Sequence, residues 1–420
     1  MWPRKQLDID WADFAFGLRS MLRPTRCRDA DILPSGWIPT DEGFVSLSVR
    51  TGWDLFLTAL ALPPGSEIIM SSVTIPDMAR IVQHHSLVPV PIDVDARRLE
   101  PDLDELEQSI SPRTRAILVA HLFGSRIDMT PIIGVARQHR LLVIEDCAQA
   151  FVGRAYGGHP DSDCSMFSFG PIKTVTALGG AVLRVRDGDL REKMALLQYA
   201  YPLQTKRAYL ARLGKYLSFR VLCKRLAYGA LVRGYRALGI DYDAAFSHAA
   251  HSFGESNFFE RIRRRPCGPL LSMLDRRLKR FERGGLARLK RRAECGDKHA
   301  RNLPPGMVVG ADNPSHTYWA FPVRVANRKE VLSALRGAGF DATARSSLVP
   351  IAGPHDGLAN GRRRAIWLEE TIFLPNGDDM PDGEWQRMSS VLCEVARAVP
   401  APEPRRVRER MAAARVSIPL

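Results

Sequence analysis

The stretch RAILVAHLFGSRIDMTPIIGVARQHRLLVIED, residues 115 to 146, contains the pattern that decides the fold. Two short apolar runs, RAILVA and LLVIED, flank a segment of helical length. Continuous apolar runs of this kind are typical of strands that are buried on both faces of a parallel sheet. The stretch therefore predicts a strand, a crossover helix and a second strand of an α/β protein.

The same alternation extends over residues 67 to 186. Further strands are predicted at EIIMSSV, LVPVPID, CSMFSF and GGAVLRV, and the helices between them at PDMARIVQHHS and PDLDELEQSI. We therefore expect a large α/β domain with a mostly parallel sheet between helices. Ligands of such sheets bind at the carboxyl ends of the strands, which is where His121, Asp146 and Ser168 stand in the sequence.

Changes in composition divide the chain into five parts. They are an N-terminal segment (1–45), the large cofactor-binding α/β domain (46–206), a basic amphipathic helical insertion (207–265), a long helix with a small C-terminal α+β domain (266–400) and a basic tail (401–420). Gly284 and Gly285 interrupt the long helix, and residues 341–347 are expected to form a strand of the small domain. The insertion fits either a helix pair packed on the body or on a second subunit, or contact with a membrane surface or lipid-linked substrate.

The composition of the 420 residues, 45% apolar and 25% charged, indicates a soluble globular protein. No apolar run suits a signal peptide or a spanning helix, so a cytoplasmic location is expected. The seven cysteines are scattered without a C-x-x-C motif, which predicts no disulfide framework and no metal site. A net charge of +14 would attract an anionic partner, such as a small-molecule metabolite, nucleic acid or an acidic membrane surface, but it does not choose among them. Without a nucleic-acid-binding motif, no nucleic acid partner is predicted, and a solvated basic face is the alternative.

A single amine, Lys173, stands in SMFSFGPIKTVTALGGAVLRV, residues 165 to 185. The carboxylate of Asp146, at the end of a buried strand, would be costly to leave unpaired, and a protonated pyridine nitrogen is a suitable partner. Pyridoxal 5′-phosphate (PLP) requires a lysine amine, an acid group at its ring nitrogen and donors for its phosphate. Lys173, Asp146 and Ser168 supply these three groups, so the sequence predicts a PLP site.

Two stretches, VAHLFGSRIDMTPIIGVARQHRLLVIEDCAQAFVGRAYGG and CSMFSFGPIKTVTALGGAVL, together resemble the core of the DegT/DnrJ/EryC1/StrS family of PLP-dependent sugar aminotransferases, a branch of fold type I. The likeness extends from about residue 40 to about residue 398 and includes HTYWAFPVRV and ETIFLPNGDDMPDGEWQRMSSVL. It implies that the large domain has a mostly parallel sheet of the seven-stranded type. It also implies that Lys173 carries the cofactor and is the catalytic residue. It also implies that Asp146 contacts the pyridine nitrogen, that Gln149 lies beside the ring and that Ser168 binds the phosphate.

The resemblance implies further site residues. Thr51 and Gly52 fall where the family has a phosphate-binding turn at a helix N-terminus. Arg80 stands where the family commonly has an asparagine and is a candidate contact of an anionic substrate group, and His316 matches a position near the substrate cleft. In this family a loop of the neighbouring subunit completes the phosphate site, which implies a homodimer. The candidates for that loop are Gln204, Lys206 and Arg207.

The implied activity is transfer of an amino group from an amino acid, glutamate by family habit, to a keto-sugar such as a nucleotide-sugar. Such a reaction belongs to glycan or secondary-metabolite biosynthesis. Fold and cofactor do not fix the reaction type. Two alternatives therefore stay open: another fold type I PLP reaction, and a PLP-binding regulator or membrane-associated scaffold without turnover.

Overall fold

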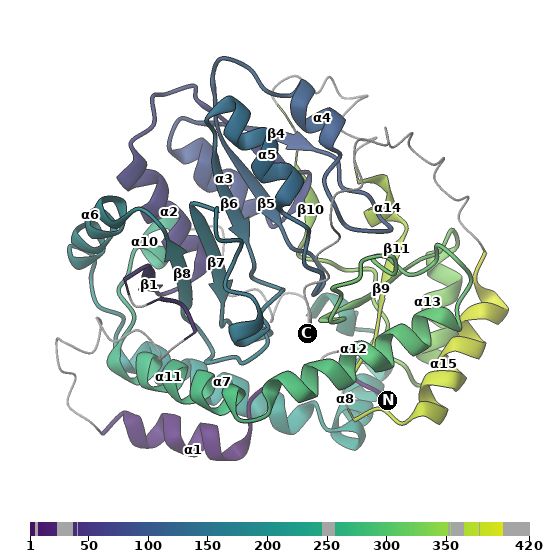
Figure 1. The fold of residues 1–420 in the computed structure, drawn as a ribbon. Helices are drawn as coiled ribbons and strands as arrows, with labels where there is room; N and C mark the ends of the chain where they lie inside the picture. The colour runs from purple at the N-terminus through teal and green to yellow at the C-terminus, as the bar shows by residue number, and fades with distance from the viewer. Residues whose placement is uncertain are drawn as a thin grey trace.

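Seven strands form the central sheet in the computed structural model, which describes residues 1–4, 7–22, 37–39, 41–245, 257–351, 353, 365–377 and 379–397 (Figure 1). In spatial order they are β1 (Gly43–Ser46), β8 (Ala181–Val185), β7 (Cys164–Ser168), β6 (Leu142–Asp146), β5 (Thr114–Ala120), β2 (Glu67–Ser71) and β4 (Val88–Ile92). The strands from β7 to β4 run parallel, and β8 runs antiparallel to both of its neighbours. The prediction of a mostly parallel sheet is confirmed.

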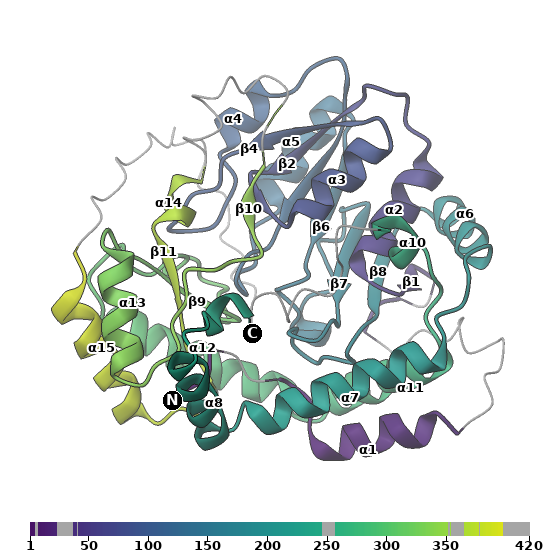
Figure 2. The same ribbon diagram turned by 180° about the vertical axis from the view of Figure 1, so that it is seen from behind.

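Alternate residues of the strands enter two apolar clusters, one on each face of the sheet. In β5, Ala116 and Leu118 belong to one cluster, and Ile117 and Val119 belong to the other. Because side chains of a strand point alternately to opposite faces, both faces are buried and the strands need no polar alternation. The first face is covered by α2 (Val49–Leu60), α3 (Pro76–His84) and α6 (Gly188–Tyr199), and the second by α4 (Leu103–Gln108) and α5 (Thr130–His139) (Figures 1 and 2).

Three helices that are far apart in the sequence contact one another at one edge of this domain (Figure 1). They are α1 (Trp11–Ser20), α7 (Lys206–Leu222) and α11 (Gly268–Glu282). The long helix is interrupted at the predicted glycine pair, and the chain continues as α12 (Gly285–Arg301). A Cβ atom at Gly285 would lie 2.0 Å from the side chain of Phe281, so the close approach of the two helices requires a glycine at this position.

The predicted basic insertion is helical where the structure describes it. Its helices are α7, α8 (Arg225–Ala237) and α10 (Phe258–Ile262). On α7, Tyr209, Leu213 and Tyr216 are buried against the body of the protein. Throughout the described ranges, no helix combines the length and the apolar character needed to span a membrane. The predicted basic tail, residues 401–420, lies outside the described residues.

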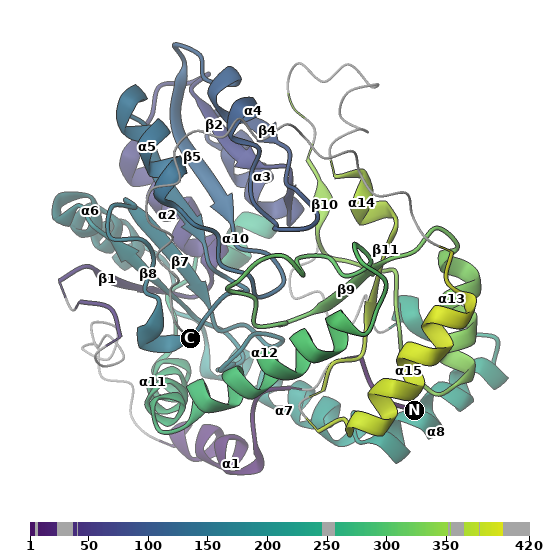
Figure 3. The ribbon, with the colours of Figure 1, turned by 45° about the vertical axis from the view of Figure 1, so that its right-hand side comes forward.

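A smaller α+β unit follows α12 (Figure 3). Its elements are β9 (Phe321–Arg324), α13 (Arg328–Gly337), β10 (Val349–Pro350), α14 (Ile366–Glu369), β11 (Thr371–Leu374) and α15 (Asp382–Val395). β9 and β11 pair antiparallel, and β10 pairs with β3 (Val73–Thr74) of the large domain. The strand predicted at residues 341–347 is wrong, because Thr343 forms only an isolated bridge to Phe373. The hydroxyl of Thr343 donates instead to Asp243 Oδ1 at 2.9 Å, which ties this segment to the part of the insertion that follows α8.

Candidate active site

A cavity of about 890 Å³ lies at the carboxyl ends of the central strands, bordered on one side by the small domain. Asp146, Ser168 and Lys173, which the sequence predicted to act together, line it with Gln149. Asp146 ends β6 and Ser168 ends the neighbouring β7, so the parallel arrangement brings both to the same edge of the sheet. Gln149 is held by its Oε1 atom, which accepts a backbone N–H at 2.8 Å.

The loop between β7 and β8 carries Lys173, and three other parts of the chain hold it. Two residues after the lysine, Val175 has a φ of 59°, a strained value for a β-branched residue. Its N–H donates to Asp8 Oδ2 of the N-terminal segment at 2.7 Å. Tyr209 of α7 donates to one carbonyl of the loop at 2.9 Å, and Arg277 of α11 donates to another at 3.1 Å. These contacts fix the backbone from which the Lys173 side chain projects.

The Lys173 amine is enclosed but has no hydrogen-bond or ion-pair partner among the described residues. Nζ lies 4.6 Å from the centre of the Trp319 ring, a distance at which a cation is attracted to the ring face. Burial lowers the pKa of Lys173 to about 8, although the carboxylate of Asp146 opposes this effect, and the positive charge of Arg50 adds to it. Because the neutral amine is the nucleophilic form, the site favours a reactive lysine near neutral pH.

The Asp146 carboxyl group is the second half of the site and is 9% exposed. Its Oδ1 atom accepts the Ala148 N–H at 3.0 Å, and its Oδ2 atom has no donor in the part of the chain that the structure describes. Burial raises the pKa of Asp146, while the Ala148 N–H and the positive charge of Lys173 act against the rise. A buried carboxylate with one unsatisfied oxygen can accept a charged N–H from a ligand. The residues therefore fit the protonated pyridine nitrogen of PLP.

A buried network behind Asp146 fixes the end of β6. His121 accepts the Ile127 N–H at Nδ1 (3.0 Å), so its Nε2 atom carries the proton and donates to Glu145 Oε2 at 2.9 Å. Burial alone would raise the pKa of Glu145, but the bonds and charge from His121, together with the Tyr156 hydroxyl, lower it to about 2. His121 does not line the cavity and acts on the site only through this framework.

The first turn of α2 borders the cavity through residues that the sequence reasoning missed. Ser48 caps the helix by accepting the Thr51 N–H at 3.2 Å, and Ser48 and Arg50 line the cavity. Thr51 is fully buried, and its hydroxyl donates to a carbonyl of α10 at 2.8 Å. Gly52 faces a leucine of β8. The structure therefore does not bring Thr51 and Gly52 to the cavity. Helix α2 begins at Val49, so these two residues lie within its first turn and not before its N-terminus, where the prediction placed them.

The two predicted substrate residues have different environments. Arg80 lines the cavity, and its guanidinium group lies 4.6 Å from the centre of the Phe258 ring. His316 does not line it: the ring is 3% exposed, stacks on Tyr318 at 4.2 Å and accepts the Tyr318 N–H at 2.8 Å. Burial lowers the pKa of His316 to about 3, and two neighbouring arginines act in the same sense. The assignment of His316 to the substrate is thus corrected, because its ring is packed away from the cavity.

Two of the three residues predicted for a partner-subunit loop are engaged within their own chain. Gln204 is 5% exposed and accepts the Cys267 N–H at 3.5 Å. Lys206 Nζ donates to the Met21 carbonyl at 3.1 Å. Both side chains are therefore engaged within their own chain, and their contact with a second subunit stays a prediction. Arg207 is exposed, and its role stays a prediction.

Helix α7 supplies a wall of the cavity that sequence reasoning did not assign. Tyr216, Phe219 and Cys223 line the same cavity as Lys173. Nearby, Arg212 Nη1 donates to the Leu178 carbonyl of the lysine loop at 3.1 Å. The sequence signal was the helical spacing of apolar residues, which predicts a buried face but not the element that this face contacts.

A seven-stranded, mostly parallel sheet with a half-buried lysine at its carboxyl edge and a small α+β domain defines the PLP-dependent transferase fold of type I. The aminotransferase TlmJ from Streptoalloteichus hindustanus has the same fold, with a TM-score of 0.67 and 21% identity over 94% of this chain and 99% of that one. Residues 47–215 match the model of the DegT/DnrJ/EryC1/StrS aminotransferase family. This match confirms the family resemblance over residues 47–215.

Two relatives match the chain over part of their length. GDP-perosamine synthase from Caulobacter vibrioides is 42% identical over 151 residues, which cover 35% of this chain and 40% of that protein. UDP-4-amino-4-deoxy-L-arabinose--oxoglutarate aminotransferase from Shewanella sediminis is 32% identical over 189 residues, which cover 40% of this chain and 48% of that protein. The chain thus spans less than half of the length of either relative.

Proposed function

We propose that the protein is a PLP-dependent aminotransferase that moves an amino group from glutamate to the carbonyl carbon of a keto-sugar. The proposal rests on one observation: two groups line the same cavity. They are the Lys173 amine, whose pKa is lowered, and the Asp146 carboxyl group, one oxygen of which has no donor among the described residues. The family match over residues 47–215 supports amino transfer. The name of the Shewanella relative, which includes oxoglutarate, supports glutamate as the donor.

Each residue of the site has a separate task in this proposal. PLP bound in the cavity would supply an electron sink that stabilises negative charge on the carbon attached to the substrate nitrogen. Asp146 would accept the N–H of the pyridine ring and so keep that nitrogen protonated. Ser168, Ser48 and the N–H groups at the start of α2 would bind the phosphate. Lys173 would hold the cofactor, and its Nζ atom would then take the proton from the substrate carbon.

The charges of the cavity favour an anionic substrate. Arg80 and Arg345 line it, and guanidinium groups suit the paired oxygens of a carboxylate or phosphate. Arg345 Nη2 also lies 3.0 Å from Asp241 Oδ2, in an exposed ion pair that an anionic substrate could replace. Tyr216 and Phe219 of α7 offer an apolar surface to the remainder of the substrate. We further propose a cytoplasmic homodimer, as is usual for the family, in which Arg207 lies near the partner subunit. Contact of the exposed, leucine-bearing surface of α8 with a membrane is a separate proposal.

Covalent attachment tests the proposal without knowledge of the acceptor. The protein is incubated with PLP, reduced with borohydride and digested, and the modified peptide is identified by mass spectrometry. We expect modification at Lys173 and its loss in Lys173→Ala. Lys279 is an exposed lysine of α11 that forms an ion pair with Asp275, so Lys279→Ala provides a matched control that should keep the modification. Reduction onto another lysine, or onto none, would contradict the proposal.

A further inference from the structure

His299 of α12 is a buried imidazole whose nitrogens are not satisfied. The side chain is 1% exposed, and neither ring nitrogen has a hydrogen-bond partner in the described part of the chain. Its ring stacks on Trp385 of α15, with centres 4.4 Å apart and an angle of 11° between the planes. A buried imidazole whose ring nitrogens have no partner is costly unless it binds a ligand.

Two further ligand groups lie beside this ring. Cys295 precedes His299 by one helical turn, a spacing that places both side chains on one face of α12. Asp382 is the first residue of α15, and its Oδ1 atom lies 3.9 Å from His299 Nε2. One ligand atom from each of the three residues lies within 4.8 Å of the others. Sulfur, nitrogen and oxygen donors thus converge from two helices.

We propose that Cys295, His299 and Asp382 bind a divalent transition-metal cation, for which Zn²⁺ is the best fit. Zinc accepts cysteine, histidine and carboxylate ligands in a tetrahedron. With bonds of about 2.0 to 2.3 Å, neighbouring ligand atoms would be roughly 3.3 to 3.8 Å apart, so small side-chain rotations would close the site. Asp382 is 59% exposed, which leaves the fourth position open to water. The site lies outside the cavity of Lys173 and does not depend on the function proposed for that cavity.

One ammonium group competes with the metal for the carboxylate. Lys298 Nζ lies 2.5 Å from Asp382 Oδ2, and the lysine side chain is 53% exposed. Because an exposed pair of this kind contributes little to stability, Lys298 can swing into solvent when a metal binds. Metal binding would then join α12, the helix that leaves the large domain, to the start of α15 and so stabilise the small domain.

A second group of metal-ligand residues lacks these features. His121, Glu145 and Cys147 also lie within reach of one another. Both nitrogens of His121 are already bonded, however, and Glu145 accepts bonds from several donors. That group therefore has no free histidine lone pair, whereas His299 has two unbonded ring nitrogens.

The test uses the full-length, PLP-loaded protein after treatment with a chelator. Zn²⁺ binding is measured by calorimetry, and Co²⁺ serves as a probe because tetrahedral cobalt absorbs in the visible range. We expect one Zn²⁺ per chain and a higher unfolding temperature with zinc. Cys295→Ser and Asp382→Asn should each weaken binding at least about tenfold and lose the cobalt absorbance, and Lys298→Ala should bind more tightly.

A matched control separates this site from general thiol chemistry. Cys393 is an exposed cysteine on α15 outside the ligand group, so Cys393→Ser should bind zinc like the wild type. The metal-free unfolding temperatures of the serine variants show whether each one is folded. Absence of stoichiometric binding in the wild type would overturn the proposal. Equal affinity of Cys295→Ser and the wild type would overturn it as well.

Discussion

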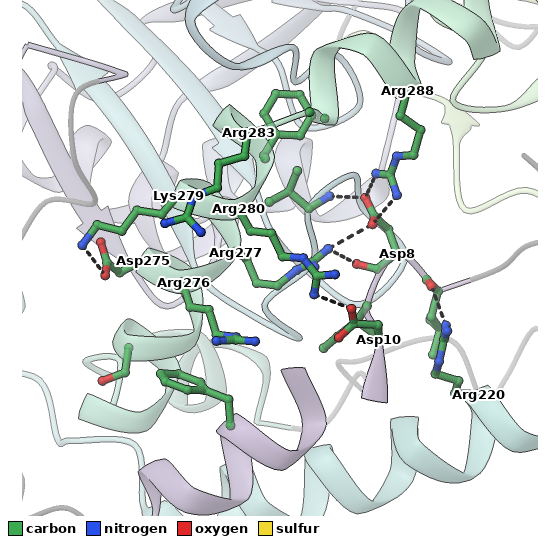
Figure 4. A pocket seen from close by; sticks show the side chains of 18 of the residues that line it. Asp8, Asp10, Arg220, Asp275, Arg276, Arg277, Lys279, Arg280, Arg283 and Arg288 are labelled. Carbon is green, nitrogen blue, oxygen red and sulfur yellow. Dashed lines mark hydrogen bonds and ion pairs between the residues drawn. The ribbon is translucent and has the colours of Figure 1, made fainter. Parts of the chain in front are cut away.

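Replacing Asp8 by asparagine should loosen the loop that carries Lys173 and lower the free energy of unfolding by about 2 kcal/mol. Asp8 Oδ2 accepts the Val175 N–H at 2.7 Å, and Arg277 Nη2 and Arg288 Nη1 each donate to Oδ1 at 2.9 Å. Figure 4 shows both arginines directed at this one carboxylate. Asparagine keeps an acceptor for the Val175 N–H but removes the charge that holds the two guanidinium groups.

The magnitude follows from the pKa of the carboxyl group, whose side chain is 19% exposed. Burial alone would raise the pKa of Asp8, but the bonds and charges of Arg288 and Arg277 lower it from 3.8 to about 2. A difference of this size between the unfolded and folded states corresponds to roughly 2.5 kcal/mol. Because the folded pKa is the lower one, this stabilisation is present above about pH 4 and is lost as the pH falls toward about 2.

Urea denaturation of the wild type and of Asp8→Asn measures this contribution. The difference between their free energies of unfolding should become smaller as the pH is lowered from about 7 to about 3. Asp275→Asn is the matched control. Asp8 and Asp275 both line a second, arginine-rich cavity beside α11 (Figure 4), but the ion pair of Asp275 with Lys279 is exposed, so the loss of unfolding free energy should stay below about 0.5 kcal/mol. The reasoning is refuted if Asp8→Asn and the wild type have the same free energy of unfolding at pH 7, or if the difference between these free energies does not change with pH.

The remaining predictions concern the catalytic groups and one helix junction. Lys173→Ala should slow amino transfer at least about 10³-fold in a product assay, because the proton-transferring amine is lost, and a rate within tenfold of wild type would contradict its role. The rate at which the apoprotein binds PLP covalently, measured by stopped-flow absorbance, should increase as the pH rises through about 8, because the neutral Lys173 amine attacks the PLP aldehyde. A rate that does not change with pH would contradict this prediction. Asp146→Asn should lower kcat about 10²-fold with a smaller change in KM, and an unchanged kcat would show that the carboxylate does not act on the ring nitrogen. Gly285→Ala should destabilise the fold by about 1 to 3 kcal/mol in thermal unfolding, because its Cβ atom would clash with the Phe281 side chain. A Cβ atom at Gly284 would have no atom within 4 Å, so Gly284→Ala should change the stability little. Equal destabilisation by the two variants would refute the packing argument.

The sheet and the pairing of Lys173 with Asp146 could be predicted because both depend on local patterns. Apolar runs such as 142–146 fix buried strands, and the parallel order of those strands brings their carboxyl ends together. The break at Gly284 and Gly285 was also visible in the sequence, since glycine pairs end helices.

Features that depend on where a helix begins or on which surface it packs could not be predicted. The start of α2 is set by the Ser48 cap, so the residues that reach the cavity precede Thr51 and Gly52. His316 looks like a cleft residue in the sequence, but burial against Tyr318 is a tertiary contact. The convergence of His299 and Asp382 likewise joins two helices that no sequence spacing relates.

The glutamate half-reaction tests the central claim most directly. PLP-loaded protein is mixed with glutamate in the absence of any acceptor, and 2-oxoglutarate is quantified while the absorbance of the cofactor is followed. The account predicts one 2-oxoglutarate per bound cofactor, with a matching conversion to pyridoxamine phosphate that is lost in Lys173→Ala. Wild-type protein that holds PLP on Lys173 and yet forms no 2-oxoglutarate would contradict it.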